Sequence, residues 1–254
     1  MFPLHNALSH HLPGIVLLFS SAASLAVLCY CLRRLDWTRL GQHRFTLHIF
    51  CLWSILLCLF NLGRTGLAEG LQLHLFALTA ATLMMGWKIS FLAAFLAQIM
   101  MSAAGFEPLA LLGWNSLLYG LLPILCSHYF SRLLQILLPP NPFVCTLGGG
   151  FFGGILSLAA TMLLSSLLLY AFGIYPPDII WQKYLKFMLV IVYPEGFVNG
   201  VGARNTVIKI AKAYLRLGLT LCKAAPLTAN AASCTASDKV GWACIIRARS
   251  SPAA

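Results

Sequence analysis

The sequence has few charged side chains, and acidic ones are especially rare. Charged residues make up 9% of the 254 residues, and Asp and Glu together number only 6. Soluble domains contain roughly 25% charged residues, so the composition excludes an ordinary soluble fold. With 60% hydrophobic residues and a mean hydropathy of +0.85, the chain is predicted to be an all-α, polytopic membrane protein. Its length suits about seven transmembrane helices.

Several motifs of catalysis are also absent. The sequence contains no GxxxxGK[ST] phosphate loop, no HExxH and no GxSxG, which argues against ATP hydrolysis, metalloprotease and esterase chemistry in this chain. The nine cysteines form no pair of CxxC elements, so a cysteine zinc site is not predicted. Seven spans leave no room for a separate soluble catalytic domain. We therefore expect that the protein is not an enzyme.

Basic residues outnumber acidic ones, at 17 Lys and Arg against 6 Asp and Glu. Most of them stand beside apolar runs, and the loop at residues 33–44 alone contains four arginines. Because basic residues concentrate in cytoplasmic loops, this pattern predicts that the 33–44 loop is inside and the N-terminus outside. The basic excess is thus explained by the lipid bilayer, and nucleic acid is not an expected partner.

Apolar stretches divide the chain into three predicted parts. Residues 1–12 form an outer N-terminal segment, residues 13–203 a seven-span transmembrane domain, and residues 204–254 a basic cytoplasmic tail, amphipathic at first and then unstructured. The predicted spans are 13–32, 45–63, 71–86, 89–104, 109–130, 145–172 and 185–203.

Helix breaks and small residues mark the region before the sixth span. The PPNP sequence at 139–142 is expected to end a helix. Gly149 with Gly153, and Gly150 with Gly154, are small residues four apart, a spacing that lets helix backbones approach closely in lipid.

One ionisable side chain, His74, lies close to the start of the third predicted span. An imidazole in hydrocarbon costs on the order of a few kcal/mol unless it faces a helix, a water-filled cavity or an ion. His74 is therefore a functional candidate, although a histidine near a helix end can also simply bond to a backbone carbonyl. In the predicted topology it lies on the outer side, as do His5, His10 and His11.

Three further polar residues inside spans are candidates for transport or coupling. Asn115 requires a polar partner, which makes it either a helix–helix contact or part of a substrate path. Glu195 stands between Pro194 and Gly196, which predicts a broken helix of the kind found at transport sites. Asn199 follows in the same segment. The alternative for Glu195 is an interfacial carboxylate in water.

The order and spacing of these residues resemble the energy-coupling-factor ABC transporter permeases of the cobalt and nickel class, the CbiM/NikM type. The resemblance covers residues 13–203. It implies a subunit of the cell inner (plasma) membrane that captures Co²⁺ or Ni²⁺ from outside, without a permanently bound cofactor. ATP-binding cassette ATPase subunits and a transmembrane coupling subunit are the implied partners. The residues that carry the resemblance are His74 of an HL pair, Gly113, Asn115, Leu117, Gly120, and Pro194, Glu195, Gly196 and Asn199 of YPEGFVNG.

The chain departs from the family pattern at the metal site. That site resembles a chelate made by the N-terminal amine, a His at position 2 and the His of the HL pair. Here position 2 is Phe2, and Gln72 stands where Ser is common. His74 alone carries over as a metal ligand, and the possible substitutes are His5, His10 and His11.

Two other functions compete with metal transport. One is a membrane enzyme acting on a lipid or isoprenoid with Glu195 and His74 as acid and base, for which the chain lacks a paired carboxylate or a ligand cluster. The other is an integral membrane assembly or interaction protein without a metal substrate.

Overall fold

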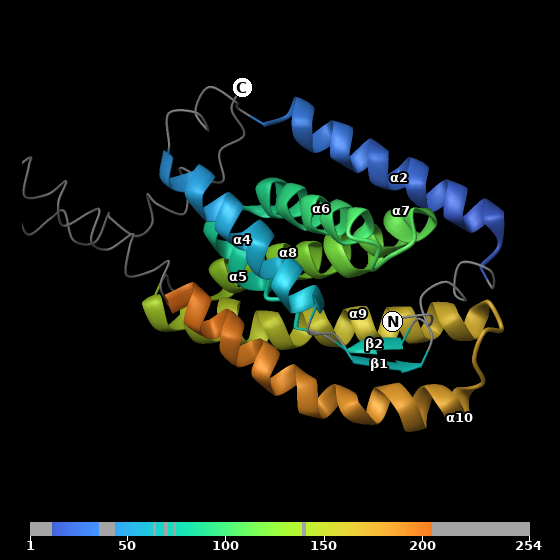
Figure 1. Ribbon diagram of the computed structural model, residues 1–254. Helices are drawn as coiled ribbons and strands as arrows, with labels where there is room; N and C mark the ends of the chain where they lie inside the picture. The colour runs from blue at the N-terminus through green and yellow to red at the C-terminus, as the bar shows by residue number, and fades with distance from the viewer. Residues whose placement is uncertain are drawn as a thin grey trace, which may run out of the picture.

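The computed structural model describes residues 12–35, 44–62, 65–68, 71–73, 75–138 and 141–204. The protein is an all-α polytopic membrane protein, to which one small β-hairpin is added (Figure 1). The first half of the described chain contains α2 (Gly14–Arg33), α4 (Arg44–Leu62), β1 (Thr65–Ala68), β2 (Leu71–Leu73), α5 (Leu78–Met85) and α6 (Trp87–Ala103).

The second half is built from three long helical runs. The 3₁₀ turn η1 (Leu109–Leu111), α7 (Leu112–Asn115), the π-helical η2 (Ser116–Leu121) and α8 (Leu122–Leu137) form the first run. The π-helical η3 (Val144–Phe152) and α9 (Gly153–Ala171) form the second, and α10 (Pro177–Ile180), η4 (Trp181–Leu185) and the helix at 186–204 form the third.

Some of the described helices are long enough to span a membrane. Three are long and apolar enough to cross a bilayer: Gly14–Arg33 with 20 residues, Leu109–Leu137 with 29 and Val144–Ala171 with 28. About 20 residues are needed for the hydrocarbon core. Two shorter apolar helices occupy Leu47–Leu62 and Trp87–Ala103. Large apolar side chains on α2 point outward, as expected for a surface that faces lipid: Ile15, Leu18 and Phe19 are 79%, 73% and 76% exposed.

The break predicted at the PPNP sequence is confirmed, because α8 ends at Leu137 and the next helix begins at residue 142. The last helix begins earlier than predicted, at Pro177 rather than at residue 185. Pro177 is compatible with a helix start because the first helical N–H has no intrahelical acceptor.

The third predicted span, at 71–86, is wrong. Strands β1 and β2 pair antiparallel, with Thr65 opposite Leu73, and α5 has only 8 residues. Eight residues extend about 12 Å, far short of the roughly 30 Å hydrocarbon core. Ala77, in the left-handed conformation with φ 49°, interrupts the backbone before α5, and Gly86 with φ 82° ends it.

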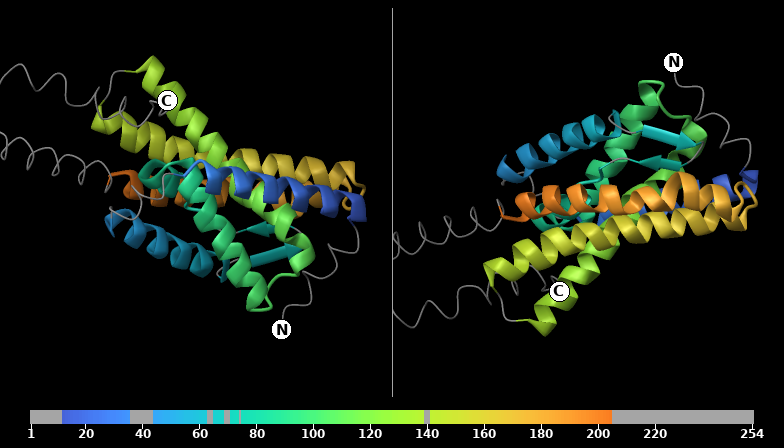
Figure 2. Two further views of the ribbon diagram at one scale, coloured as in Figure 1. Left: turned by 90° about the horizontal axis from the view of Figure 1, so that it is seen from above. Right: turned by 90° about the horizontal axis from the view of Figure 1, so that it is seen from below.

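Helix α5 is apolar because protein surrounds it. Six of its residues are buried: Leu78, Thr79, Ala80, Ala81, Thr82 and Met85. The helix contacts α4, α6, α8 and α9, so it lies within the bundle and not at its edge (Figures 1 and 2). An apolar run in a sequence has the same composition whether lipid or protein covers it, which is why 71–86 reads as a span.

The predicted close approach at the glycine stripe is confirmed for Gly150 and Gly154. A methyl group at Gly150 would lie 2.7 Å from the Ala203 Cβ atom, and one at Gly154 would lie 3.0 Å from the Asn199 Cβ atom. Both neighbours belong to the last helix, which runs alongside η3 and α9 in Figures 1 and 2. The two glycines therefore bring the Asn199 side of the last helix into the interior.

Candidate functional site

Glu195 lies on the last helix and is completely buried. Its Oε2 atom accepts a hydrogen bond from the backbone N–H of Phe76 at 2.8 Å, and Oε1 accepts one from the N–H of Ala77 at 2.8 Å. The interpretation of Glu195 as an interfacial carboxylate in water is therefore wrong. The carboxylate instead holds a segment that lies more than a hundred positions earlier in the sequence.

The helix that carries Glu195 is not broken. It continues from residue 186 to residue 204, with Pro194 exposed on its outer side. Gly196 meets a packing requirement, because a methyl group there would lie 2.8 Å from Ile155 Cγ1. The discontinuity predicted at 194–196 occurs on the facing segment instead, where Ala77 adopts φ 49° and ψ 15°.

Asn199, one helical turn after Glu195, completes the contact. Its side-chain oxygen accepts from the backbone N–H of Ala80 at 2.7 Å, and its Nδ2 donates to Glu195 Oε1 at 2.7 Å and to the Glu195 carbonyl at 2.8 Å. The first N–H groups of a helix lack intrahelical acceptors, and the residue before α5 makes no side-chain cap. Glu195 and Asn199 supply that cap from another helix, and we call the pair the Glu195–Asn199 clamp.

Hydroxyl groups anchor α5 on its other sides. The Thr79 hydroxyl lies 2.6 Å from the Ser127 hydroxyl on α8 and 3.0 Å from the Ser157 hydroxyl on α9. Ser127 donates in turn to the Pro123 carbonyl at 2.7 Å. All of these atoms are buried, so the start of α5 is fixed by the last helix, by α8 and by α9 together.

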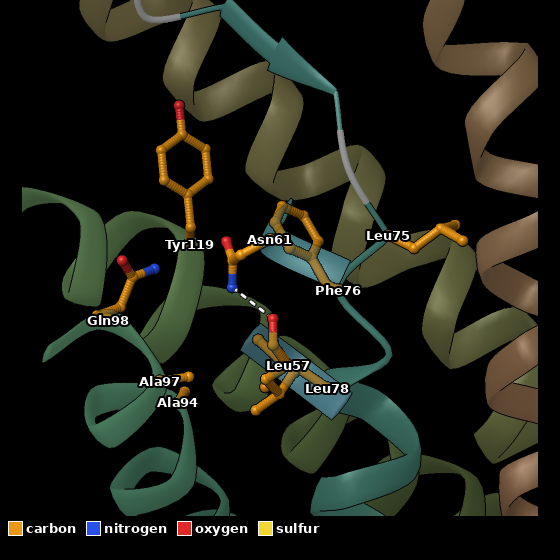
Figure 3. A pocket seen from close by; sticks show the side chains of 9 residues that line it. All are labelled: Leu57, Asn61, Leu75, Phe76, Leu78, Ala94, Ala97, Gln98 and Tyr119. Atoms are coloured by element: carbon orange, nitrogen blue, oxygen red, sulfur yellow. Dashed lines mark hydrogen bonds between the residues drawn. The ribbon is translucent and has the colours of Figure 1, made fainter. Parts of the chain in front are cut away.

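A small cavity of about 20 Å³ adjoins the segment before α5 (Figure 3). Leu75 and Phe76 line one side, and α4 and α6 contribute Asn61 and Gln98. Asn61 Nδ2 donates to the Leu57 carbonyl at 2.8 Å. Among the described residues, neither Asn61 Oδ1 nor the buried Gln98 Oε1 has a hydrogen-bond donor. The volume suits about one water molecule.

Asn115 is satisfied by a residue near it in the sequence. Its Nδ2 donates to Glu107 Oε2 at 3.1 Å, and both side chains are buried. The helix–helix contact is made by the next residue, since the hydroxyl groups of Ser116 and Ser24 are 2.6 Å apart. Sequence reasoning missed the role of Glu107, and an acidic residue in an otherwise apolar turn was the signal available. A substrate-path role for Asn115 stays a prediction.

The four histidines predicted as metal ligands, His74, His5, His10 and His11, lie outside the described residues. Within the described ranges, no group of three or more His, Cys, Asp or Glu side chains is arranged to hold a metal ion. The sequence neighbours of His74 are described: Leu73 ends β2, and Leu75 lines the cavity. The clamp therefore fixes the backbone from two residues after His74 onward.

These features define a helical membrane protein whose short internal helix is capped by a buried carboxylate and amide. Residues 9–211 match the family model described as "CbiM: Cobalt uptake substrate-specific transmembrane region", and the chain belongs to this family. The resemblance inferred from the sequence is thereby confirmed.

Two solved structures have a similar fold. They are a truncated transition metal transporter and a transition metal transporter, each with a TM-score of 0.56 and 16% sequence identity to this chain. The similarity covers 80% of this chain, together with 96% of the first structure and 91% of the second. At that identity the likeness supports the fold alone. No curated protein matches the chain.

Proposed function

We propose that this protein is the substrate-capturing membrane subunit of an importer for a divalent transition metal ion, with Co²⁺ or Ni²⁺ as the transported ion. Family membership over residues 9–211 supports this function. The proposal assigns capture to the transmembrane domain at 13–203 together with the outer segment at 1–12. The basic stretch at 204–254 is a cytoplasmic tail in this proposal.

The structural observation that carries the proposal is the Glu195–Asn199 clamp. It binds the N–H groups of Phe76 and Ala77 with a completely buried carboxylate. Metal ligands bind well when the surrounding structure fixes their position, and loss of such support typically costs 10-fold to 100-fold in affinity. In this proposal the role of Glu195 and Asn199 is to position the chain that carries His74.

The proposed ligands are imidazole groups. His74 binds the ion together with one or more of His5, His10 and His11. These histidines replace the one that the family pattern has at position 2, where this chain has Phe2. Imidazole is a suitable ligand for Co²⁺ and Ni²⁺. Ligation requires the neutral ring, so the affinity is expected to fall as the pH drops below about 6.5, the ordinary pKa of histidine.

Energy for import comes from other subunits in this proposal. ATP-binding cassette ATPases and a transmembrane coupling subunit of the inner (plasma) membrane act on this chain, which has no phosphate-binding loop of its own. Purified alone in vesicles, the chain is expected to show neither ATP hydrolysis nor metal accumulation against a gradient. ATP turnover by the isolated subunit would contradict this division of labour.

The experiment that tests the function is calorimetry on the purified chain with Ni²⁺ and with Co²⁺. His74→Ala is expected to weaken binding by about 10-fold to 100-fold, as for other losses at a metal site. His48→Ala, an exposed histidine on α4, is the matched control and is expected to bind like the wild type. Equal affinities for His74→Ala and the wild type would remove His74 from the site. Absence of binding to the wild type would favour an assembly protein without a metal substrate.

A further inference from the structure

An open groove of about 340 Å³ lies between α2, α6 and the η2–α8 run. Its size falls in the range of about 300 to 1,000 Å³ that is usual for small-molecule sites. The groove differs from the Glu195–Asn199 clamp in its residue types, because no titratable side chain except a tyrosine lines it. The lining residues are Ala26, Val27, Tyr30, Trp87, Leu121 and Leu125.

Aromatic rings and one ammonium group stand together at the groove. Lys88 Nζ lies 6.0 Å from the centre of the Tyr30 ring and 5.9 Å from the centre of the Trp87 ring. The same ammonium donates to the Arg34 carbonyl at 3.3 Å. Lysine beside tyrosine and tryptophan is the usual composition at the level of lipid headgroups.

Two further cations, Arg34 and Arg132, belong to the part of the chain around the groove. Arg34 follows α2 directly, and His128 packs its ring 6.5 Å from that of Trp87, one turn before Arg132 on α8. Among the residues that the structure describes, no carboxylate pairs with Lys88, Arg34 or Arg132. The groove thus combines an apolar lining with cations nearby in the fold that have no anionic partner among the described residues.

We propose that this groove binds one acyl chain of an anionic phospholipid, with the headgroup phosphate beside Lys88. The apolar lining fits a hydrocarbon chain. Lys88, Arg34 and Arg132 pair with no carboxylate of the described residues, and their charges favour a headgroup with net negative charge over a zwitterionic one. The predicted topology places this end of the molecule at the cytoplasmic leaflet, where anionic lipids are found. The site does not depend on metal binding.

Native mass spectrometry of the full chain in detergent tests the headgroup contact. Phosphatidylglycerol and phosphatidylcholine with identical acyl chains are titrated separately. The first phosphatidylglycerol molecule to bind is expected to have at least about five-fold higher affinity than the first phosphatidylcholine molecule. Lys88→Gln is expected to lower phosphatidylglycerol affinity about five-fold, the effect of one basic side chain near an anionic surface. Lys183→Gln removes an exposed lysine outside the groove and is expected to change nothing.

A second pair of variants tests whether an acyl chain occupies the groove. Ala26 and Ala22 are both exposed on α2, but only Ala26 lines the groove. Ala26→Trp is expected to fill the groove and abolish tight binding of phosphatidylglycerol. Ala22→Trp is expected to retain that binding. Equal binding of the two lipids to the wild type, an unchanged preference in Lys88→Gln, or retention of the lipid in Ala26→Trp would each overturn the proposal.

Discussion

The side-chain amide of Asn199 donates to the Glu195 carboxylate at 2.7 Å while its oxygen accepts from the backbone N–H of Ala80. One side chain thus bonds both to the carboxylate and to the helix that the carboxylate caps. The arrangement holds Ala77 in a left-handed conformation, which costs a residue with a side chain about 1 to 3 kcal/mol. The hydrogen bonds of the clamp offset that strain.

The first prediction concerns Glu195→Gln. Glutamine retains one acceptor oxygen and replaces the other with an amide nitrogen, so either Phe76 or Ala77 loses the acceptor for its buried N–H. The expected loss of stability is about 1 to 3 kcal/mol, measured as a lower thermal midpoint in detergent. Asp178→Asn removes an exposed carboxylate and serves as the control. A midpoint that does not change in Glu195→Gln would contradict a capping role.

A second prediction concerns Gly154→Ala. The added methyl group would lie 2.9 Å from Asn199 Nδ2, so the last helix must move away or the clamp must distort. Overpacking of this kind costs about 1 to 3 kcal/mol. The matched control is Gly14→Ala, where an added methyl group meets nothing within 4 Å. If both variants melt at the wild-type temperature in detergent, the close packing of the two helices is not needed for stability.

The third prediction is that one water molecule occupies the cavity beside Leu75. Asn61 Oδ1 and Gln98 Oε1 are buried acceptors that no donor of the described residues reaches, and a water molecule can donate one O–H to each. A high-resolution crystal structure is expected to show solvent density within hydrogen-bonding distance of both oxygens. Gln98→Leu is expected to lose that density, while Gln182→Leu, an exposed position, retains it. An empty cavity in the wild type would contradict the prediction.

The fourth prediction concerns topology. A cysteine at position 38, in the arginine-rich loop, is expected to react with an impermeant maleimide only after permeabilisation, because that loop is predicted to be cytoplasmic. A cysteine at position 183 is expected to react in intact cells. Both are introduced into a chain whose nine native cysteines are replaced. Labelling of position 38 in intact cells would reverse the predicted orientation.

The sequence predicts the long helices well because hydrocarbon thickness sets a minimum length for apolar runs. It does not predict α5, since a helix buried by protein is as apolar as one that faces lipid. Length and periodicity then give no basis for a distinction. Ala77 adds to the difficulty, because alanine is a strong helix former and nothing local indicates that it adopts a left-handed conformation.

The candidate site was predictable in its residues but not in its geometry. Glu195 and Asn199 stand out as polar residues in an apolar segment, and both are part of the clamp. Their partners are backbone N–H groups of Phe76, Ala77 and Ala80, which every sequence position except proline possesses. A bond to such a group leaves no trace in residue types, so the broken helix was assigned to the wrong side of the contact.

The separation between Glu195 and Phe76, 119 positions along the chain, has a consequence for biosynthesis. Helix α5 is too short to insert across a bilayer by itself, and its cap is synthesised only with the last helix. During translation the N–H groups at the start of α5 therefore remain without their acceptors until the last helix enters the membrane. Ribosome-bound chains that stop before residue 195 are expected to remain sensitive to protease around residues 65 to 86, and full-length chains to resist.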